Sequence, residues 1–306
     1  MIFIKPNFWQ TKNLISLFLY PLTLITFSIN FLKKLNIKRN FKIKTICIGN
    51  LSAGGTGKTS LAVELNELLK DKFKTVFIKK RYLNQKDEYN LLKKRGKIIS
   101  SNSRIDALKA AEKNFDLAIL DDGLQQKNIK YDLKIVCINS YEGFGNNFLL
   151  PAGPLRENSS ELKNYDIVFL NGFKKNQKIK KKIKKINNNL EIFDAIYEPT
   201  NFKEYNIKNK FLSFCGIGNP HEFENTLKKF KFKIKEKLIF PDHYSISDEI
   251  IDNMKDIANK NKLKIITTEK DFLRLTKKQQ QGINYLKVKL KIQNINKLKK
   301  FLKSNI

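Results

Sequence analysis

Residues 49–59 read Gly49-Asn-Leu-Ser-Ala-Gly-Gly-Thr-Gly-Lys-Thr59, and this glycine-rich run follows a short apolar segment and precedes a helical pattern. A strand, a glycine-rich turn and a helix in this order are typical of a phosphate-binding loop, because backbone N–H groups and the positive helix end meet phosphate oxygens there. The usual pattern has glycine where Ser52 stands, but the Gly-Gly-Thr-Gly-Lys-Thr core is intact. An ordinary strand-to-helix turn would leave the adjacent lysine and threonine unexplained. The predicted nucleotide-binding residues are Ser52, Ala53, Gly54, Gly55, Thr56, Gly57, Lys58 and Thr59.

Two acids end another apolar run, Leu117-Ala-Ile-Leu-Asp-Asp-Gly123. Ligands of parallel α/β sheets collect at the carboxyl ends of strands, so Asp121 or Asp122 is expected to hold Mg²⁺ directly or through water. The Thr59 hydroxyl is the other predicted metal ligand. Asp-Gly is also a common turn pair, so a strand-end turn is the alternative. Beside the phosphate loop, the acids predict a magnesium–nucleotide site.

Short apolar runs alternate with helical patterns from Lys42 onward, which predicts βαβ units and a parallel sheet. A Pro- and Gly-containing stretch at 151–158 separates two such halves. The predicted domains are an apolar N-terminal segment at 1–40, a phosphate-loop lobe at 41–150 and a second α/β lobe at 151–306. The expected strands are Ile43–Ile48, Thr75–Ile78, Leu117–Leu120, Ile135–Ile138, Ile167–Leu170, Ile192–Ile196, Phe211–Cys215, Phe232–Ile239, Ile265–Thr268 and Tyr285–Leu290, and the expected helices are Thr59–Leu69, Ile105–Lys113, His221–Lys229 and Ser247–Lys260.

The segment from Leu14 to Leu32 carries no charge and is close to the length of a membrane-spanning helix, which needs roughly 20 residues. It contains Pro21 and Asn30, and basic residues flank it on both sides. A cleaved signal peptide is disfavoured, because the apolar stretch is too long and no small-residue cleavage site follows. The segment is expected to lie in the membrane interface, with a single span and a helix buried on the protein as alternatives. The basic residues after it favour a cytoplasmic location for the rest of the chain.

The chain has 306 residues, with 60 Lys and Arg against 29 Asp and Glu, and a net charge of +31. This excess predicts an anionic partner (nucleic acid, an acidic membrane surface or a phosphorylated substrate) unless it reflects composition alone. Three cysteines in separate apolar runs predict buried thiols in a reducing compartment, and two histidines exclude a multi-histidine metal site. The lysine-rich run from Lys174 to Lys185 is interpreted as a solvated helix face, with a lipid or nucleic-acid contact as the alternative.

The type of reaction stays open on these residues, since a kinase, an ATPase and a switch protein share a magnesium–nucleotide site. A kinase also needs a group that orients or deprotonates the acceptor hydroxyl. Candidates are Asp87, Glu88, His221 and His243. The sequence contains no Asn-Lys-x-Asp string for guanine recognition and no nucleic-acid-binding motif. A membrane-associated P-loop ATPase or GTPase of transport or switching is the alternative to a kinase.

Seven strings carry a resemblance to one known family. In chain order they are Gly49-Asn-Leu-Ser-Ala-Gly-Gly-Thr-Gly-Lys-Thr59, Asp121-Asp-Gly-Leu-Gln125, Gly143-Phe-Gly145, Leu149-Leu-Pro-Ala-Gly-Pro-Leu-Arg-Glu157, Gly216-Ile-Gly-Asn-Pro220, Phe240-Pro-Asp-His-Tyr244 and Thr267-Thr-Glu-Lys-Asp271. Together they resemble the tetraacyldisaccharide 4′-kinases, the lipid A 4′-kinases of Gram-negative bacteria, over nearly the whole chain.

The resemblance implies transfer of the ATP γ-phosphoryl group to the 4′-hydroxyl of a tetraacylated, 1-phosphorylated glucosamine disaccharide. It implies a P-loop NTPase-like α/β fold, with two α/β/α lobes around a cleft and an N-terminal membrane-associated helix. The implied location is the cytoplasmic face of the bacterial inner membrane. ATP, Mg²⁺, the acylated phosphoglycolipid and the anionic membrane surface are the expected partners, and no nucleic acid is expected.

The family's catalytic acid lies in a Gly-Asp-Glu-Pro motif that corresponds to Lys86-Asp-Glu-Tyr89. By this resemblance Asp87 is the base candidate, and His243 is its partner from the second lobe. Such a histidine can position the carboxylate and hold its proton affinity near the working range.

The chain also departs from the family pattern. Its Lys79–Leu83 segment replaces Ser-Arg-Gly-Tyr-Gly, so the loop glycines are gone, and Gln126 replaces a histidine. Arg104 lies where the family carries a basic residue near the nucleotide.

Overall fold

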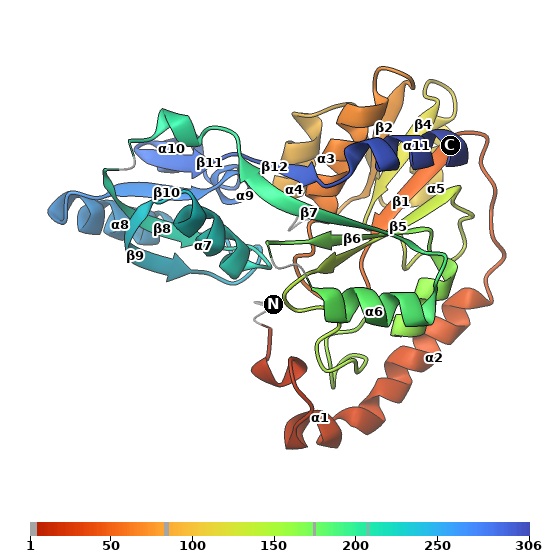
Figure 1. Cartoon of the computed structure of the whole chain (residues 1–306). Helices are drawn as coiled ribbons and strands as arrows, with labels where there is room; N and C mark the ends of the chain where they lie inside the picture. The colour runs from red at the N-terminus through yellow and green to blue at the C-terminus, as the bar shows by residue number, and fades with distance from the viewer. Residues whose placement is uncertain (1–4, 83–85, 174–175, 207) are drawn as a thin grey trace. The chain divides into compact units, whose positions relative to one another are not determined.

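The computed structural model describes residues 5–82, 86–173, 176–206 and 208–306 (Figure 1). These residues form two compact units. The larger unit contains Lys5–Arg81, Arg95–Ile196 and Ile292–Ile306, and the smaller contains Tyr82–Lys94 and Tyr197–Lys291. Each unit is therefore assembled from separate stretches of the chain.

A mainly parallel sheet forms the centre of the larger unit, as the alternating pattern predicts, although the end of β7 and most of β12 belong to the stretch Tyr197–Lys291 of the smaller unit. Within the described residues it has eight strands, in the order β12-β7-β6-β5-β1-β4-β2-β3. Strands β2, β3 and β4 lie on one side of β1, and β5, β6 and β7 lie on the other side. The direction in which successive strands are added to the sheet therefore reverses at β1. In open α/β sheets, ligands bind at such a reversal, outside the carboxyl ends of the strands. The glycine-rich loop begins there, at the carboxyl end of β1. The strands are β1 Lys44–Gly49, β2 Thr75–Lys80, β3 Ile98–Ser101, β4 Leu117–Asp121, β5 Leu133–Asn139, β6 Ile167–Asn171, β7 Glu191–Pro199 and β12 Val288–Ile292.

Helices cover both faces of this sheet. Helix α3 (Lys58–Leu69) packs on β1, β2 and β4, and Figure 1 shows it on the same side as α11 (Ile295–Asn305). Helices α5 (Arg104–Ala111) and α6 (Gln177–Ile186) bury apolar side chains in the core of the other face. In α6 the buried residues are Ile179 and Ile183 while most of its lysines are exposed, which fits a solvated face. Lys174 and Lys175 of that run lie outside the described residues.

The smaller unit is also a three-layer α/β/α structure. Its described residues form a four-stranded parallel sheet in the order β11-β10-β8-β9. Helix α8 (Asp248–Lys260) packs on one face and α7 (Pro220–Lys229) on the other. The Ser247 side chain accepts the N–H of Ile250 and so satisfies a free donor at the start of α8. The remaining elements are α4 Lys86–Lys93, β8 Lys210–Cys215, β9 Lys233–Ile239, β10 Lys264–Thr268, α9 Glu269–Phe272, α10 Lys277–Gln280 and β11 Ile283–Leu286.

The units do not coincide with the domain boundary expected at residue 150. Strand β6 pairs with β5 and strand β7 with β6, so the first sheet continues well beyond that point. Helix α4 lies between β2 and β3 in sequence but belongs to the smaller unit. The strand predicted at Tyr285–Leu290 is two strands, because the N–H and C=O of Lys287 bond to Asn201 and Thr200 instead.

The apolar N-terminal segment is interrupted rather than one helix. It contains α1 (Leu14–Phe18), the short 3-10 helix η2 (Tyr20–Leu22) and α2 (Thr23–Lys34). Pro21 lies within η2, where its ring and missing N–H prevent an uninterrupted α-helix. Among the residues that the structure describes, none of the helices is long and apolar enough to cross a membrane.

Helix α2 turns its polar side to the larger unit and its apolar side outward. Thr26 Oγ1 donates to the carbonyl of Leu150 at 2.7 Å, and Asn30 Nδ2 donates to the carbonyl of Arg156 at 2.7 Å. The helix therefore docks through polar contacts, which is the reverse of a helix that packs on a protein core. The large apolar side chains left exposed from α1 to α2 are Leu14, Ile15, Leu17, Phe18, Tyr20, Leu22, Leu24, Ile25, Phe27, Ile29, Phe31 and Leu32.

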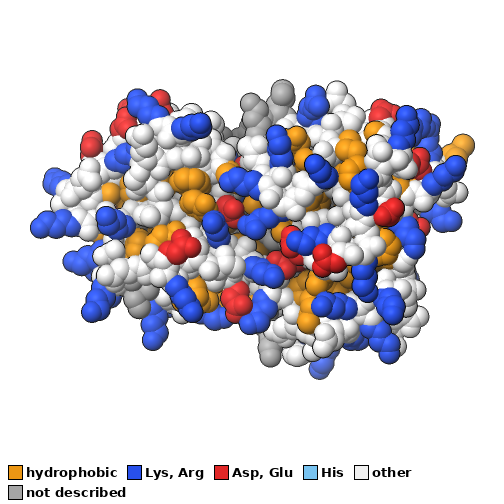
Figure 2. Space-filling view, turned by 90° about the horizontal axis from the view of Figure 1, so that it is seen from above, with side chains coloured by type: hydrophobic (Ala, Val, Ile, Leu, Met, Phe, Trp, Pro, Cys, Tyr) orange, Lys and Arg blue, Asp and Glu red, His pale blue; other side chains and the backbone are white. Residues whose placement is uncertain are grey.

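On the face drawn in Figure 2, the positive charge is distributed rather than gathered. Figure 2 shows Lys and Arg side chains scattered over one face, with acidic and apolar side chains between them. This face has no single basic stripe of the kind that tracks a nucleic-acid backbone.

Candidate functional site

The predicted phosphate loop lies between β1 and α3, as its sequence indicates. Gly57 precedes the first residue of α3 with φ +86°, a left-handed conformation that side chains disfavour. Lys58 and Thr59 form the first turn of α3, so they lie at its positive end. The loop therefore has the backbone and the helix start that phosphate binding requires.

The Leu149–Glu157 string, which overlaps the stretch expected between the lobes and is one of the seven strings of the family resemblance, contacts the phosphate loop. Ala53 N–H donates to Pro154 O at 2.8 Å, and Arg156 N–H donates to Leu51 O at 2.6 Å. Asn171 at the end of β6 donates from Nδ2 to Thr56 O at 2.6 Å. The loop is thus held from two directions.

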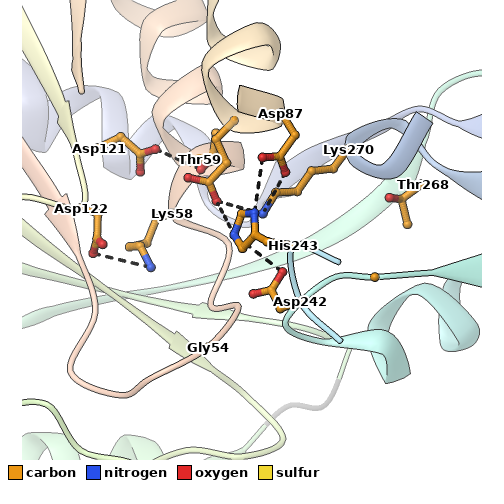
Figure 3. A network of polar contacts seen from close by, with 12 residues as sticks. Gly54, Lys58, Thr59, Asp87, Asp121, Asp122, Asp242, His243, Thr268 and Lys270 are labelled. Carbon is orange, nitrogen blue, oxygen red and sulfur yellow. Dashed lines mark hydrogen bonds and ion pairs between the residues drawn. The ribbon is translucent and has the colours of Figure 1, made fainter. Parts of the chain in front are cut away.

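The predicted metal ligands lie together at the carboxyl end of β4. Thr59 Oγ1 donates to Asp121 Oδ2 at 3.0 Å, and Lys58 Nζ lies 3.6 Å from Asp122 Oδ1 (Figure 3). Asp121 Oδ1 is buried and has no hydrogen-bond partner among the described residues. A carboxylate oxygen without a protein partner, beside a hydroxyl, fits Mg²⁺, which binds through few protein ligands and keeps several waters.

Asp122 is held in a strained and cationic environment. Its backbone has φ +59°, in the left-handed region that residues other than glycine adopt uncommonly, although aspartate enters it more readily than most. Burial acts to raise the pKa of Asp122, but the neighbouring cations outweigh it and the pKa lies below its usual value. Those cations are Lys58, Arg156, Arg104 and Lys79.

Two of these contacts explain residues that the sequence left uncertain. Arg104 donates from Nη2 to the carbonyl of Asp122 at 2.6 Å and from Nη1 to Gln126 Oε1 at 3.3 Å. Gln126, which departs from the family pattern, is therefore a partner of Arg104. Arg156 Nη1 lies 3.2 Å from Asp122 Oδ1 and donates to Asn50 Oδ1 at 3.0 Å.

The sequence did not predict a lysine at this site. Lys79 Nζ lies 2.8 Å from Asp121 Oδ2, and both side chains are almost completely buried. Lys79 is the penultimate residue of β2, next to β4 in the sheet, so its side chain reaches the neighbouring strand's end. In the sequence, a lysine near the end of an apolar run indicates that the strand is reaching solvent, so the pattern does not predict that Lys79 is buried. Leu83, at the other end of the divergent segment, lies outside the described residues.

Replacing Lys79 by methionine is expected to lower the free energy of unfolding by about 3–5 kcal/mol, because it leaves a buried carboxylate without its cation. Urea unfolding measures the change. The double variant K79M/D121N should recover part of the loss, and K72M, which removes an exposed lysine, should have little effect. Wild-type stability in K79M would show that the Lys79–Asp121 pair does not hold this strand end together.

The predicted catalytic pair forms within the smaller unit. Asp87 in α4 and His243 after β9 are distant in sequence, yet Asp87 Oδ1 and His243 Nδ1 lie 3.4 Å apart (Figure 3). Neither atom has another hydrogen-bond partner in the described part of the chain. His243 has φ +61°, so it too is held in a strained conformation.

Cations surround the Asp87 carboxylate. Arg274 donates to Asp87 Oδ2 from Nη2 at 2.8 Å and from Nε at 3.1 Å, and Lys270 Nζ lies 3.6 Å from the same oxygen. Burial acts to raise the pKa of Asp87, but the His243 contact and the charges of Lys270 and Arg274 outweigh it. The pKa of Asp87 therefore lies well below its usual value.

Of the other two candidates for a catalytic role, Glu88 lies beside the Asp87–His243 pair and His221 does not. Glu88 lies beside the pair, with Oε1 2.8 Å from Lys270 Nζ and 3.9 Å from His243 Nε2. His221 is 83% exposed at the start of α7 and lies outside this cluster. The sequence did not assign Lys270 or Arg274 a role, although Lys270 lies in the Thr267–Asp271 string.

Comparisons with known proteins show which family this chain resembles over nearly its whole length. The family model described as tetraacyldisaccharide-1-P 4′-kinase matches residues 15–306. A tetraacyldisaccharide 4′-kinase of Pelagibacter ubique is 45% identical over 98% of both chains, and one of Rickettsia typhi is 34% identical over 88% of both. The crystal structure of LpxK from Aquifex aeolicus in complex with ATP has the same fold, with TM-score 0.71, 24% identity, and 95% of this chain and 99% of that chain covered.

Proposed function

The chain belongs to the tetraacyldisaccharide 4′-kinase family, and we propose that it transfers the γ-phosphoryl group of ATP to the 4′-hydroxyl of tetraacyldisaccharide 1-phosphate in lipid A biosynthesis. The observation that carries this proposal is the Asp87–His243 pair, which an ATPase or a switch protein does not need. A phosphate loop alone is common to all three classes of protein.

The larger unit supplies the nucleotide-binding groups of the proposed reaction. Residues 52–59 surround the phosphates of ATP, and Lys58 neutralises charge on the β- and γ-phosphates. Thr59, Asp121 and Asp122 would hold Mg²⁺. When bound, this ion shields the phosphate oxygens and offsets the charge that develops during transfer. Arg156 and Arg104 keep Asp122 ionised and fixed in place.

The smaller unit supplies the groups that receive the hydroxyl proton. Asp87 orients the acceptor hydroxyl, and the Asp87–His243 pair takes the proton as the new phosphate ester bond forms. Because the pKa of Asp87 lies well below its usual value, the accepted proton does not stay on that carboxylate. His243 Nδ1, which lies 3.4 Å from Asp87 Oδ1, is the neighbouring group in the pair that can accept it.

We further propose that the enzyme works on the cytoplasmic face of the bacterial inner membrane, bound through α1, η2 and α2. The exposed apolar side chains of these helices point away from the larger unit, and basic residues follow them. Such a surface binds the boundary between headgroups and acyl chains, where a four-chain lipid substrate resides.

The double substitution L24E/F31E is expected to abolish binding to vesicles that contain anionic phospholipid, because it places charges on the exposed apolar side of α2. Co-sedimentation measures this binding. The matched control I239E/I257E changes two exposed isoleucines of the smaller unit and should leave vesicle binding intact. If L24E/F31E still pellets like the wild type, these helices are not the membrane contact.

A labelled-phosphate assay tests the reaction directly. The full-length protein is incubated with γ-labelled ATP, Mg²⁺ and tetraacyldisaccharide 1-phosphate in detergent micelles. The proposal expects label in the lipid. Release of label only as inorganic phosphate would support the ATPase alternative instead.

A further inference from the structure

Arg274 hydrogen-bonds to only one of the two carboxylate oxygens of Asp87. Both Nη2 and Nε donate to the same oxygen, Oδ2, at 2.8 and 3.1 Å, while the Asp87 side chain is 1% exposed. This fork leaves Oδ1 as the oxygen that faces His243 Nδ1. The guanidinium therefore determines which oxygen of Asp87 is available to the histidine.

The other edge of the guanidinium is fixed to the backbone of the smaller unit. Arg274 Nη1 donates to Asp271 Oδ1 at 2.7 Å and to Gly216 O at 2.6 Å. Gly216 O also accepts the backbone N–H of His243 at 3.2 Å. The Gly216 carbonyl thus accepts hydrogen bonds from both the arginine and the histidine. A Cβ added at Gly216 would lie 3.1 Å from the carbonyl oxygen of Pro241, so the backbone here is closely packed.

Arg274 has few donors left for a substrate. Its contacts with Asp87, Asp271 and Gly216 use four of its N–H groups, out of about five in a guanidinium. The remaining side of Nη2 faces Asp242, whose Oδ1 lies 3.9 Å away. This occupancy argues against a role in binding the phosphate of a substrate.

The charges around the pair come from several elements. The carboxylates that face His243 or Arg274 are those of Asp87, Glu88, Asp242 and Asp271, and the cations are Arg274 and Lys270. Lys270 has its shortest contact with Glu88, at 2.8 Å, and lies farther from Asp87, at 3.6 Å. Arg274 is therefore the cation that contacts Asp87 most closely.

We propose that Arg274 is a positioning residue of the phosphoryl-transfer site, which holds Asp87 ionised with Oδ1 turned toward His243. The inference rests on the proposed function, because it takes Asp87 and His243 as the pair that receives the hydroxyl proton. Arg274 acts through Asp87 and does not touch the substrate.

The first test compares R274Q and R274K with the wild type in full-length protein. R274Q is expected to lower kcat about 10- to 100-fold while the KM for ATP changes less than about twofold, because the nucleotide groups lie in the larger unit. R274K restores the positive charge but not the paired hydrogen bonds from Nε and Nη2 to Asp87 Oδ2, so it should recover part of kcat. K278Q, which removes an exposed lysine of α10, is the control and should behave as wild type.

The pH profile separates positioning from a general structural effect. In R274Q the pKa of Asp87 should rise, since burial then acts against fewer cations. The acidic limb of kcat should therefore move to higher pH in R274Q and return toward wild type in R274K. An unchanged limb, or a loss expressed mainly in KM for the lipid, would overturn the inference.

A stability measurement keeps the test independent of the kinase assay. A carboxylate whose pKa is lowered by folding stabilises the folded state at pH values above its pKa in the unfolded chain, which is about 4. This contribution is lost as the pH falls toward the pKa in the folded state. R274Q should therefore be less stable than the wild type at neutral pH, and the difference should shrink as the pH falls below about 4. A difference that does not depend on pH would refute the Arg274–Asp87 role. A wild-type protein without transferase activity would refute the proposed function alone.

Discussion

Substituting Asp87 with asparagine is expected to lower kcat about 10²- to 10⁴-fold, which is the usual contribution of a positioned acid–base group. Asparagine keeps the size of the side chain but cannot accept a proton from the acceptor hydroxyl. Initial rates of label transfer to the lipid measure the effect. The affinity for ATP should be retained, because the phosphate loop and both acids of β4 lie in the other unit.

Two comparisons make the Asp87 experiment decisive. D252N removes an exposed carboxylate of α8 in the same unit and should turn over like the wild type. H243A should also lose most of its kcat, and the double variant D87N/H243A should be little worse than either single variant, since the two residues act together. Near-normal turnover in D87N would remove Asp87 from the proton-accepting role.

Replacing Lys58 by methionine is expected to reduce γ-phosphoryl transfer by roughly 10²- to 10³-fold, as when one preorganised charge-stabilising group is lost. The lysine would contact the phosphates that carry the developing charge, and methionine keeps most of the length of the side chain without the cation. The folded state should change little, because the 3.6 Å Lys58–Asp122 contact is partly solvated.

The matched control for Lys58 is K72M, which removes an exposed lysine just beyond α3. It should keep wild-type transfer rates in the same assay. Full activity in K58M would mean that the phosphate loop binds nucleotide through its backbone alone, and the predicted role of Lys58 would be rejected.

The local pattern of the sequence predicted most of the fold. The phosphate loop, the acids at the end of β4 and most strands follow from runs of a few residues, because each depends on neighbours in the chain. Strand β3 and helix α11 were not predicted. Helix α4 was not predicted as a helix, since its eight residues are mostly polar and contain only a short apolar stretch. Its membership of the smaller unit depends on contacts with segments more than 100 residues away, which no local pattern contains.

The site was predicted less completely than the fold. Asp87 and His243 were assigned from a family resemblance, and spacing alone did not distinguish Asp87 from other solvated acids. Arg274 and Lys79 were missed because the chain has 60 Lys and Arg residues, and the sequence does not distinguish a buried one from the many exposed ones. What marks them is burial against a carboxylate, which is a property of the folded molecule.

The interleaving of the two units along the chain has a consequence for fragments and incomplete products. Asp87 precedes residues 95–196 of the larger unit, and His243 follows them. No contiguous piece of the gene can therefore encode the smaller unit by itself. A chain that stops before residue 243 still contains the whole glycine-rich loop and both acids of β4, yet has only half of the catalytic pair. Retention of nucleotide is consequently a poor measure of whether a preparation of this protein is full length.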